Sequence, residues 1–132
     1  MFTIENLDHI GLAVSDLQTS IEWYKRVLLL EEERHADWGD SPVMMVGKSG
    51  SGLALFPSKE GLPAGISGLP HYAFKVNAGS FGKSKAHLTS QGISWYFQDH
   101  TISQSIYFRD PDNHLLEITC YEIDKIIEAN ET

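Results

Sequence analysis

The segment LDHIGLAV at residues 7–14 returns 62 residues later as LPHYAFKV at residues 69–76. Leucine, histidine and valine hold the same places in both copies, and a small residue follows each histidine by two positions. The same shift needs no gap further on, since it lays residues 43–47 on 105–109 and residues 52–56 on 114–118. A pattern that repeats at a fixed period indicates two copies of one supersecondary unit. The chain is therefore predicted to contain two similar modules.

The repeat also sorts the residues that could carry chemistry. His9 and His71 occupy equivalent places, whereas the place of Glu117 is taken in the first copy by Leu55. The two histidine positions and the two positions of Leu55 and Glu117 therefore carry three potential metal ligands and one apolar residue. We expect Leu55 to line the same cavity as Glu117, and we count it among the candidate substrate contacts.

Composition restricts the class of protein. The chain has 132 residues, enough for a sizeable core, and residues 1–132 are treated as a single domain. Its net charge of −8 argues against a nucleic-acid partner, and no apolar run approaches the roughly 20 residues that span a membrane. The start carries no signal-peptide core. The single cysteine, Cys120, excludes an internal disulfide framework and suits a reducing compartment, so we predict a cytoplasmic protein.

Each module is predicted to have the order βαβββ, which makes the fold class α+β. Module one covers about 7–57, residues 58–70 form a Gly- and Pro-rich linker, and module two covers about 71–121. Apolar alternation and turn residues predict strands at 8–14, 30–34, 43–47 and 52–57, and again at 71–76, 93–98, 104–109 and 115–121. Helices are expected from a cap at Ser15 or Asp16 to Leu28, over 80–90, and at the C-terminal end over 122–130.

The two histidines lie on the less apolar faces of their strands. His9 shares its side with Gly11 and Ala13, and His71 shares its side with Ala73 and Lys75. The opposite sides carry large apolar residues, which must pack under the helices. The small-residue sides are expected to line a concave surface, where the two histidines are candidates to converge.

Glu117 is an unusual residue for the otherwise apolar strand in which it lies. Glutamate is rarely fully buried unless it is paired or bound to a metal. A five-residue loop before this strand, ending at His114, would place Tyr107 opposite Glu117 and Ser105 opposite Thr119. A four-residue loop would pair Tyr107 with Leu116 and turn the glutamate to the other side. We favour the five-residue loop because it keeps Phe108 with Leu116 in the core.

These residues resemble the vicinal oxygen chelate superfamily, which comprises glyoxalases, bleomycin- and fosfomycin-resistance proteins and extradiol dioxygenases. The resemblance covers nearly the whole chain, from Leu7 to about Ile126. It rests on DHI at 8–10, VSDL at 14–17, WY at 23–24, HYAF at 71–74 and, most specifically, SIYFRDPDNHLLE at 105–117.

The resemblance implies that the two βαβββ modules form a curved mixed sheet around a central cleft that holds a metal. It assigns His9, His71 and Glu117 as ligands of a divalent ion, Fe(II), Mn(II), Ni(II) or Zn(II). It gives Tyr107 a hydroxyl that faces substrate or oxygen, so Tyr107 and Glu117 are the candidate catalytic residues. It further implies a small-molecule substrate and a homodimer, and the modules can be exchanged between the chains of such a dimer.

Each branch of the superfamily differs from this chain at some position. Glyoxalase I has a fourth ligand, a glutamate, where the repeat places Leu55. The cationic positions of the fosfomycin branch fall near Phe97 and Ile126, and the acid–base histidine of the dioxygenases falls on Gln98, two residues from His100. Further candidates for substrate contact are Lys75, His100 and Arg109.

Three hypotheses about function follow. The first is a metal-dependent enzyme on a small oxygen-rich molecule, ring-cleaving like the dioxygenases or lyase-like. The second is a fosfomycin-type thiol transferase. The third is a binding protein that sequesters a drug between aromatic side chains such as Trp38, Trp95 and Tyr96. The presence of all three ligand residues argues against the third hypothesis, because a pure binder does not need them.

Overall fold

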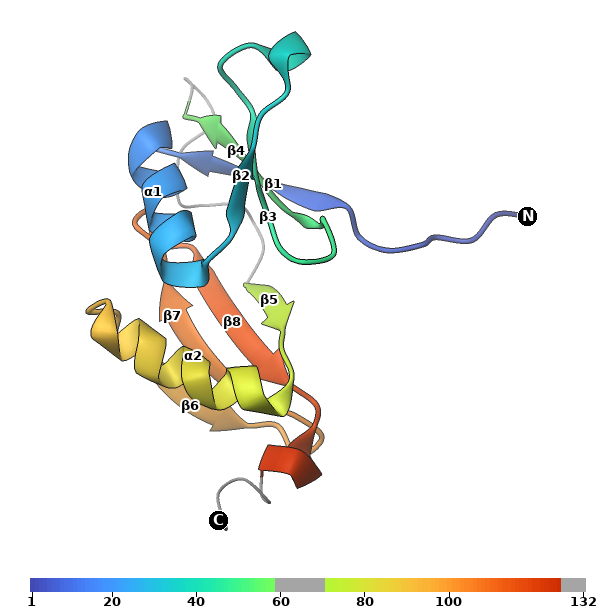
Figure 1. The fold of residues 1–132 in the computed structure, drawn as a ribbon, viewed down its shortest axis with the longest axis vertical. Coiled ribbons are helices and arrows are strands. Elements are labelled where there is room, and N and C mark those ends of the chain that lie inside the picture. Colours follow the sequence, from blue (N-terminus) through green and yellow to red (C-terminus); the bar gives the residue numbers. More distant parts are fainter. Residues whose placement is uncertain (59–70, 127–132) are drawn as a thin grey trace. The chain divides into compact units, whose positions relative to one another are not determined.

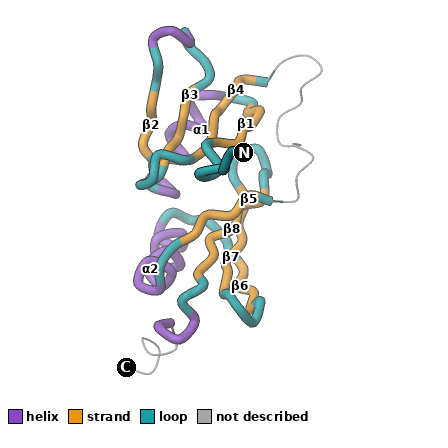
Figure 2. Tube along the Cα trace, turned by 90° about the vertical axis from the view of Figure 1, so that its right-hand side faces the viewer, coloured by secondary structure: helices purple, strands orange, loops and turns teal. Residues whose placement is uncertain are grey.

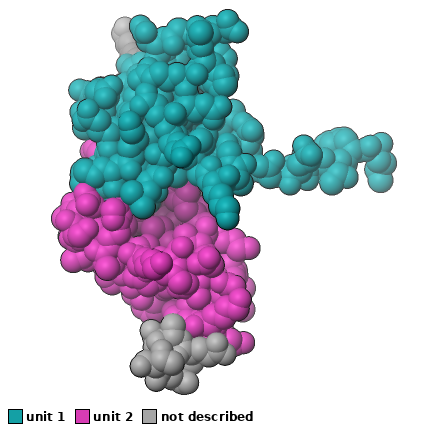
Figure 3. All heavy atoms as spheres, viewed as in Figure 1, with its two compact units in different colours: residues 1–67 teal, residues 68–132 magenta. Residues whose placement is uncertain are grey.

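The computed structural model describes residues 1–58 and 71–126. The chain divides into two compact units, Met1–Ser67 and Gly68–Thr132, which Figure 3 colours teal and magenta. Each unit contains one βαβββ module with its own four-stranded mixed sheet, so the predicted α+β class and the two modules are confirmed. No helix among the described residues is long and apolar enough to cross a membrane.

Unit 1 contains β1 (His9–Val14), α1 (Leu17–Leu28), β2 (Glu31–Glu33), β3 (Val43–Val46) and β4 (Gly52–Pro57), with a short 3₁₀ turn, η1 (Ala36–Trp38), before β3 (Figure 1). The sheet order is β1-β4-β3-β2, and β1 runs parallel to β4. Helix α1 begins after Asp16, whose carboxylate accepts a hydrogen bond from the Thr19 backbone N–H at 3.1 Å.

Unit 2 repeats this order with β5 (Tyr72–Lys75), α2 (Ala78–Ser90), β6 (Tyr96–Asp99), β7 (Gln104–Arg109) and β8 (Leu115–Cys120). The sheet order is β5-β8-β7-β6, and Figure 2 shows these strands lying side by side. Helix α2 starts two residues earlier than predicted because Asn77 is its cap, accepting from the Ser80 N–H at 2.9 Å. The chain is helical at 123–126; the rest of the predicted C-terminal helix, and residues 59–70 of the predicted linker, lie outside the described residues.

One face of each sheet packs under its helix. In unit 1 the buried residues on that face are Leu12, Val14, Val43, Met45, Leu53 and Leu55, and α1 packs against β3 and β4. In unit 2 they are Tyr72, Ile106, Phe108, Leu116, Ile118 and Cys120, and α2 contacts β8. The opposite face of each sheet carries the histidine, as the strand alternation predicts.

Candidate active site

The face of the unit 2 sheet that turns away from α2 is polar, and we call it the polar face. Its central row runs across all four strands, because Ala73 lies opposite Glu117, Glu117 opposite Tyr107, and Tyr107 opposite Tyr96. The predicted five-residue loop before β8 is therefore confirmed, and the four-residue alternative is wrong. This register places Glu117 and Tyr107 on the same face.

Glu117 is held at both of its oxygen atoms. Its residue is 7 % exposed, Oε1 lies 2.9 Å from His71 Nε2, and Oε2 accepts a hydrogen bond of 2.6 Å from the Ser105 hydroxyl. Ser105 Oγ is also 3.0 Å from Thr119 Oγ1. Because the single hydroxyl proton of Ser105 goes to the carboxylate, Thr119 must donate to Ser105. This chain of hydrogen bonds fixes the rotation of the carboxylate and turns Oε1 toward His71.

Ser105 thus orients the Glu117 carboxylate. Its place opposite Thr119 was predicted from the sequence, but this role was not. Its only sequence signal was its place two residues before Tyr107 on the same face of the strand. If Glu117 binds a divalent ion, we expect Ser105→Ala to weaken the metal affinity about 10- to 100-fold, the usual effect of removing a partner that orients a ligand. Isothermal titration with Mn(II) measures the change, and Ser105→Thr, which keeps the hydroxyl, is the matched control. Unchanged affinity in Ser105→Ala would remove this role.

Tyr107 is enclosed by aromatic and imidazole rings. It is 6 % exposed, stacks on Tyr96 with ring centroids 5.1 Å apart, and meets the His71 ring edge-to-face at 5.9 Å. Burial raises the pKa of the Tyr107 phenol above its usual value of 10.0, and the Glu117 charge adds to this shift. The hydroxyl therefore stays protonated at neutral pH, and a hydrogen bond to the Glu117 carboxylate contributes to the raised pKa.

His100 lies 2.7 Å from this hydroxyl through Nε2. The contact depends on the turn between β6 and β7, where Thr101 adopts a positive φ of 73° and its N–H donates to Asp99 Oδ1 at 2.8 Å. His100 was a candidate for substrate contact. The structure places it beside Tyr107, where it can exchange a hydrogen bond with the phenol.

The two cations proposed as substrate contacts also lie on the polar face. Arg109 donates from its guanidinium to the Asn113 carbonyl at 3.1 Å. Lys75 lies opposite Thr119, and its Nζ is 5.9 Å from the centre of the Tyr121 ring. Both residues are exposed.

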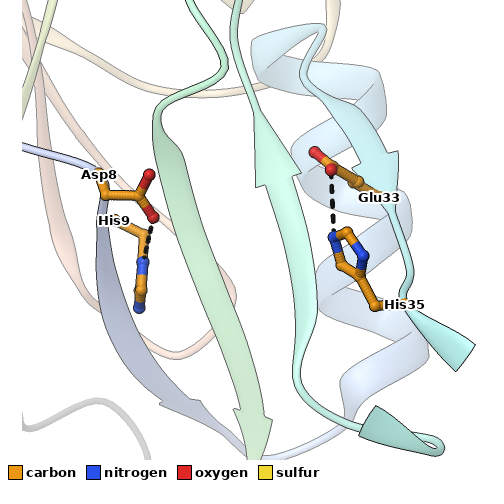
Figure 4. Close-up of polar contacts among 4 residues, drawn as sticks. All are labelled: Asp8, His9, Glu33 and His35. Carbon is orange, nitrogen blue, oxygen red and sulfur yellow. Dashed lines mark hydrogen bonds and ion pairs between the residues drawn. The ribbon is translucent and has the colours of Figure 1, made fainter. Parts of the chain in front are cut away.

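In unit 1, His9 begins β1, and its side chain is 47 % exposed. Its Nδ1 lies 2.7 Å from Asp8 Oδ2 (Figure 4). A proton on Nδ1 leaves the Nε2 lone pair free to bind a metal. A second pair, His35 and Glu33 at 3.1 Å, lies near β2, which is at the opposite edge of the sheet from β1 (Figure 4).

The predicted place of Leu55 needs a correction. His9 lies opposite Gly52, and His71 would lie opposite Leu115 by extension of the β5–β8 register, so the fourth strands match with a shift of 63 rather than 62. The counterpart of Glu117 is consequently Ala54. Leu55 has no exposed surface and lies opposite Leu12 on the face under α1, so it cannot line a cavity beside His9.

The donors in unit 2 suit part of a divalent-metal site. An imidazole and a buried carboxylate are ligands that Fe, Mn, Ni and Zn all accept, and the carboxylate has no Lys or Arg partner among the described residues. Within either unit, no three His, Cys, Asp or Glu side chains of the described residues gather closely enough to hold an ion. One unit by itself therefore supplies two ligands at most from the predicted set.

The family is decided by comparison with known proteins. The model of the glyoxalase/bleomycin resistance protein/dioxygenase superfamily matches residues 6–118. The chain belongs to this superfamily.

Relatives within the superfamily include named enzymes. The chain is 32 % identical over 115 residues to the glutathione transferase FosA of Serratia marcescens, covering 87 % of this chain and 80 % of that protein. It is 25 % identical over 128 residues to the catechol-2,3-dioxygenase of Bacillus subtilis (strain 168), covering 89 % of this chain but 43 % of that protein. A glyoxylase/bleomycin resistance protein/dioxygenase domain from Frankia sp. EAN1pec matches the fold with a TM-score of 0.73 at 24 % identity, over 90 % of this chain and 93 % of that domain.

Proposed function

We propose that the chain is a divalent-metal-dependent enzyme that acts on a small substrate with two neighbouring oxygen atoms. The observation that carries the proposal is the buried Glu117 carboxylate, with one oxygen fixed by Ser105 and the other turned to His71. Burying a charged carboxylate costs free energy unless a nearby positive charge compensates it, and no Lys or Arg side chain does so here among the described residues. A metal ion supplies that charge, which supports a site here.

His71 and Glu117 would hold the metal together with His9, which comes from unit 1 of the same chain or of a second copy. Once bound, such an ion polarises substrate oxygens and stabilises negative charge that develops on them. Asp8 keeps the His9 ring oriented through Nδ1. Three protein ligands leave positions open for the substrate.

Tyr107 and His100 would hold and transfer a proton beside the substrate. The phenol has a single proton, which the Glu117 carboxylate, an unprotonated His100 Nε2 or a substrate oxygen can accept. When Nε2 is an acceptor, the phenol proton can turn toward His100. A proton on His100 Nε2 therefore leaves the phenol proton of Tyr107 for the Glu117 carboxylate or for a substrate oxygen.

Metal titration of untagged protein followed by a substrate screen tests this proposal. We expect about one equivalent of divalent ion per chain to bind, and turnover of at least one probe among catechols, 2-oxoaldehyde–thiol adducts, and fosfomycin with a thiol. Protein stripped with a chelator should lose turnover and regain it with the ion. Failure to bind any of Mn(II), Fe(II), Ni(II) or Zn(II) would end the proposal.

A thiol transferase is the second candidate, favoured by the 32 % identity to glutathione transferase FosA. It would consume one thiol for each molecule of fosfomycin, whereas a dioxygenase would consume oxygen with a catechol, so the two assays separate the candidates. A protein that binds these compounds without turnover would instead be a sequestering binder. We also propose a cytoplasmic homodimer, and sedimentation at micromolar concentration tests the dimer.

A further inference from the structure

We propose that the segment before β1, residues 1–8, docks as an added strand on the free edge of β6 in a second copy of this chain. We call this segment the arm. The inference rests on the homodimer proposed above, but not on the metal or the substrate. It joins two surfaces that a single copy leaves without a partner and that fit each other.

The arm has the pattern of a strand but lies outside the sheet. It projects from unit 1 as an extended trace (Figure 1), and Phe2 and Ile4 are 87 % and 73 % exposed. These two residues alternate with the polar Thr3 and Glu5, which is the period of a strand with one apolar face. No backbone–backbone hydrogen bond ties residues 1–7 to another described residue. A single copy therefore gives the arm no neighbouring strand.

Strand β6 offers an edge to which a strand can be added. It lies at the end of the unit 2 sheet, and within the described residues it pairs with β7 alone. Its outer side therefore keeps unpaired backbone N–H and C=O groups. Among the strands that the structure describes, the exposed large apolar side chains are Tyr96 and Phe97, both on β6. An open edge with exposed apolar residues favours the addition of another strand.

The side chains of the arm and of the edge match in spacing. Phe97 lies on the face under α2, as does Trp95, whose indole N–H donates to Thr89 of that helix at 3.0 Å. Phe2 and Ile4 are also two residues apart, so in either strand direction this pair would stand beside the two aromatic rings. Cross-strand pairs of aromatic and β-branched side chains stabilise a sheet.

Charge favours this edge over its counterpart in unit 1. Strand β2 has the same place in the first sheet and consists of Glu31–Glu33, an edge of carboxylates that disfavours an arm carrying Glu5. Strand β6 carries one carboxylate, Asp99 at its end. Lys85 Nζ lies 5.2 Å from the centre of the Phe97 ring and places a positive charge at this edge. The acidic arm is therefore attracted to β6 rather than to β2.

Thiol cross-linking between two differently tagged copies tests the contact directly. One copy carries Thr3→Cys and the other carries Gln98→Cys on β6, and a short bismaleimide should join one copy of each kind. The native Cys120 is buried, and copies without an added thiol control for it. The matched control moves the second thiol to β2 as Glu31→Cys, which should give at least about tenfold less product because the carboxylates exclude the arm.

A chain that carries both new thiols shows which copy the arm contacts. It should link to its partner and not to itself. A link formed within one chain overturns the second copy as the occupant of the β6 edge.

Deletion of residues 2–6 tests the contribution of the arm to assembly. The deletion ends before β1, and it should weaken the dimer at least about 100-fold in sedimentation equilibrium, because the apolar anchors and the strand pairing are lost together. Phe97→Glu gives β6 a charge of the kind that β2 carries and should weaken the dimer about tenfold or more. Trp38→Glu makes the same change at another exposed aromatic residue, in η1, and should leave the dimer intact.

The outcomes separate the arm contact from the homodimer itself. Unchanged dimer affinity without the arm, or an equal loss in Trp38→Glu, overturns the arm contact and leaves the homodimer in place. A parent protein that is monomeric at every concentration overturns the homodimer and the arm contact together. Neither result bears on the proposed enzyme, which metal binding and turnover test separately.

Discussion

Replacing Glu117 with glutamine should abolish turnover and weaken divalent-metal binding by at least about 100-fold. Glutamine has nearly the same shape and can still accept the Ser105 hydrogen bond, but a neutral amide is a much poorer ligand than a carboxylate for a divalent ion. The loss should exceed that from removing an orienting partner such as Ser105. Metal content after dialysis and turnover with the best probe measure both effects.

Because the substitution preserves volume, the metal-free variant should melt near the metal-free parent. Glu22→Gln is a suitable control, since Glu22 is exposed on α1 and bonds only to Gln18 among the contacts described for it. It should keep both metal and turnover. A Glu117→Gln protein with full metal content and full turnover would show that Glu117 is neither ligand nor catalyst.

Replacing Tyr107 with phenylalanine should lower turnover about a hundredfold or more and leave metal content unchanged. A preorganised donor at a developing negative charge contributes roughly 2.7–4 kcal/mol to the transition state. Phenylalanine keeps the ring stack on Tyr96 and removes only the hydroxyl. The comparison of turnover with metal content therefore separates Tyr107 from Glu117.

The pKa of Tyr107 fixes the pH range of this test. Its pKa is raised in the folded protein, mainly by burial, so the proton stays bound through the neutral range. The contribution of this pKa shift to the free energy of unfolding is fully present below pH 10 and is lost as the pH rises through the raised pKa of Tyr107. Tyr96→Phe, which removes an exposed hydroxyl from the neighbouring ring, should retain turnover. Full activity in Tyr107→Phe would mean that Tyr107 only packs.

The sequence predicted the order of elements because its apolar periods and caps are clear, and it predicted the β7–β8 hairpin because Glu117 breaks an apolar strand. It placed Leu55 wrongly for a physical reason. Strands β3 and β4 are apolar on both faces, and all of Val43–Val46 is buried. Such strands carry no alternation to reveal a shift by one residue. Unit 2 has one more residue than unit 1 between its first and third strands, and the ungapped repeat missed it.

The contacts of Ser105 and His100 could not be predicted from the sequence, for a different reason. Which hydroxyl turns to Glu117 depends on the rotamers of three neighbouring side chains. The position of His100 depends on a positive φ at Thr101, a residue that seldom adopts it. Both are tertiary effects, whereas the strands themselves follow from local patterns.

Ala54 stands in unit 1 where unit 2 has Glu117, and this difference has a consequence for how the chain could evolve. A single base change turns any alanine codon into a glutamate or an aspartate codon, so a carboxylate at the place of the fourth ligand of glyoxalase I is one mutation away at position 54. Ala54 is 1 % exposed, and a carboxylate buried there would be destabilising without a cation to compensate it. Selection could therefore retain that mutation only in a cell that keeps the protein loaded with metal. The supply of metal in the cell would then decide whether position 54 stays alanine while unit 2 keeps Glu117.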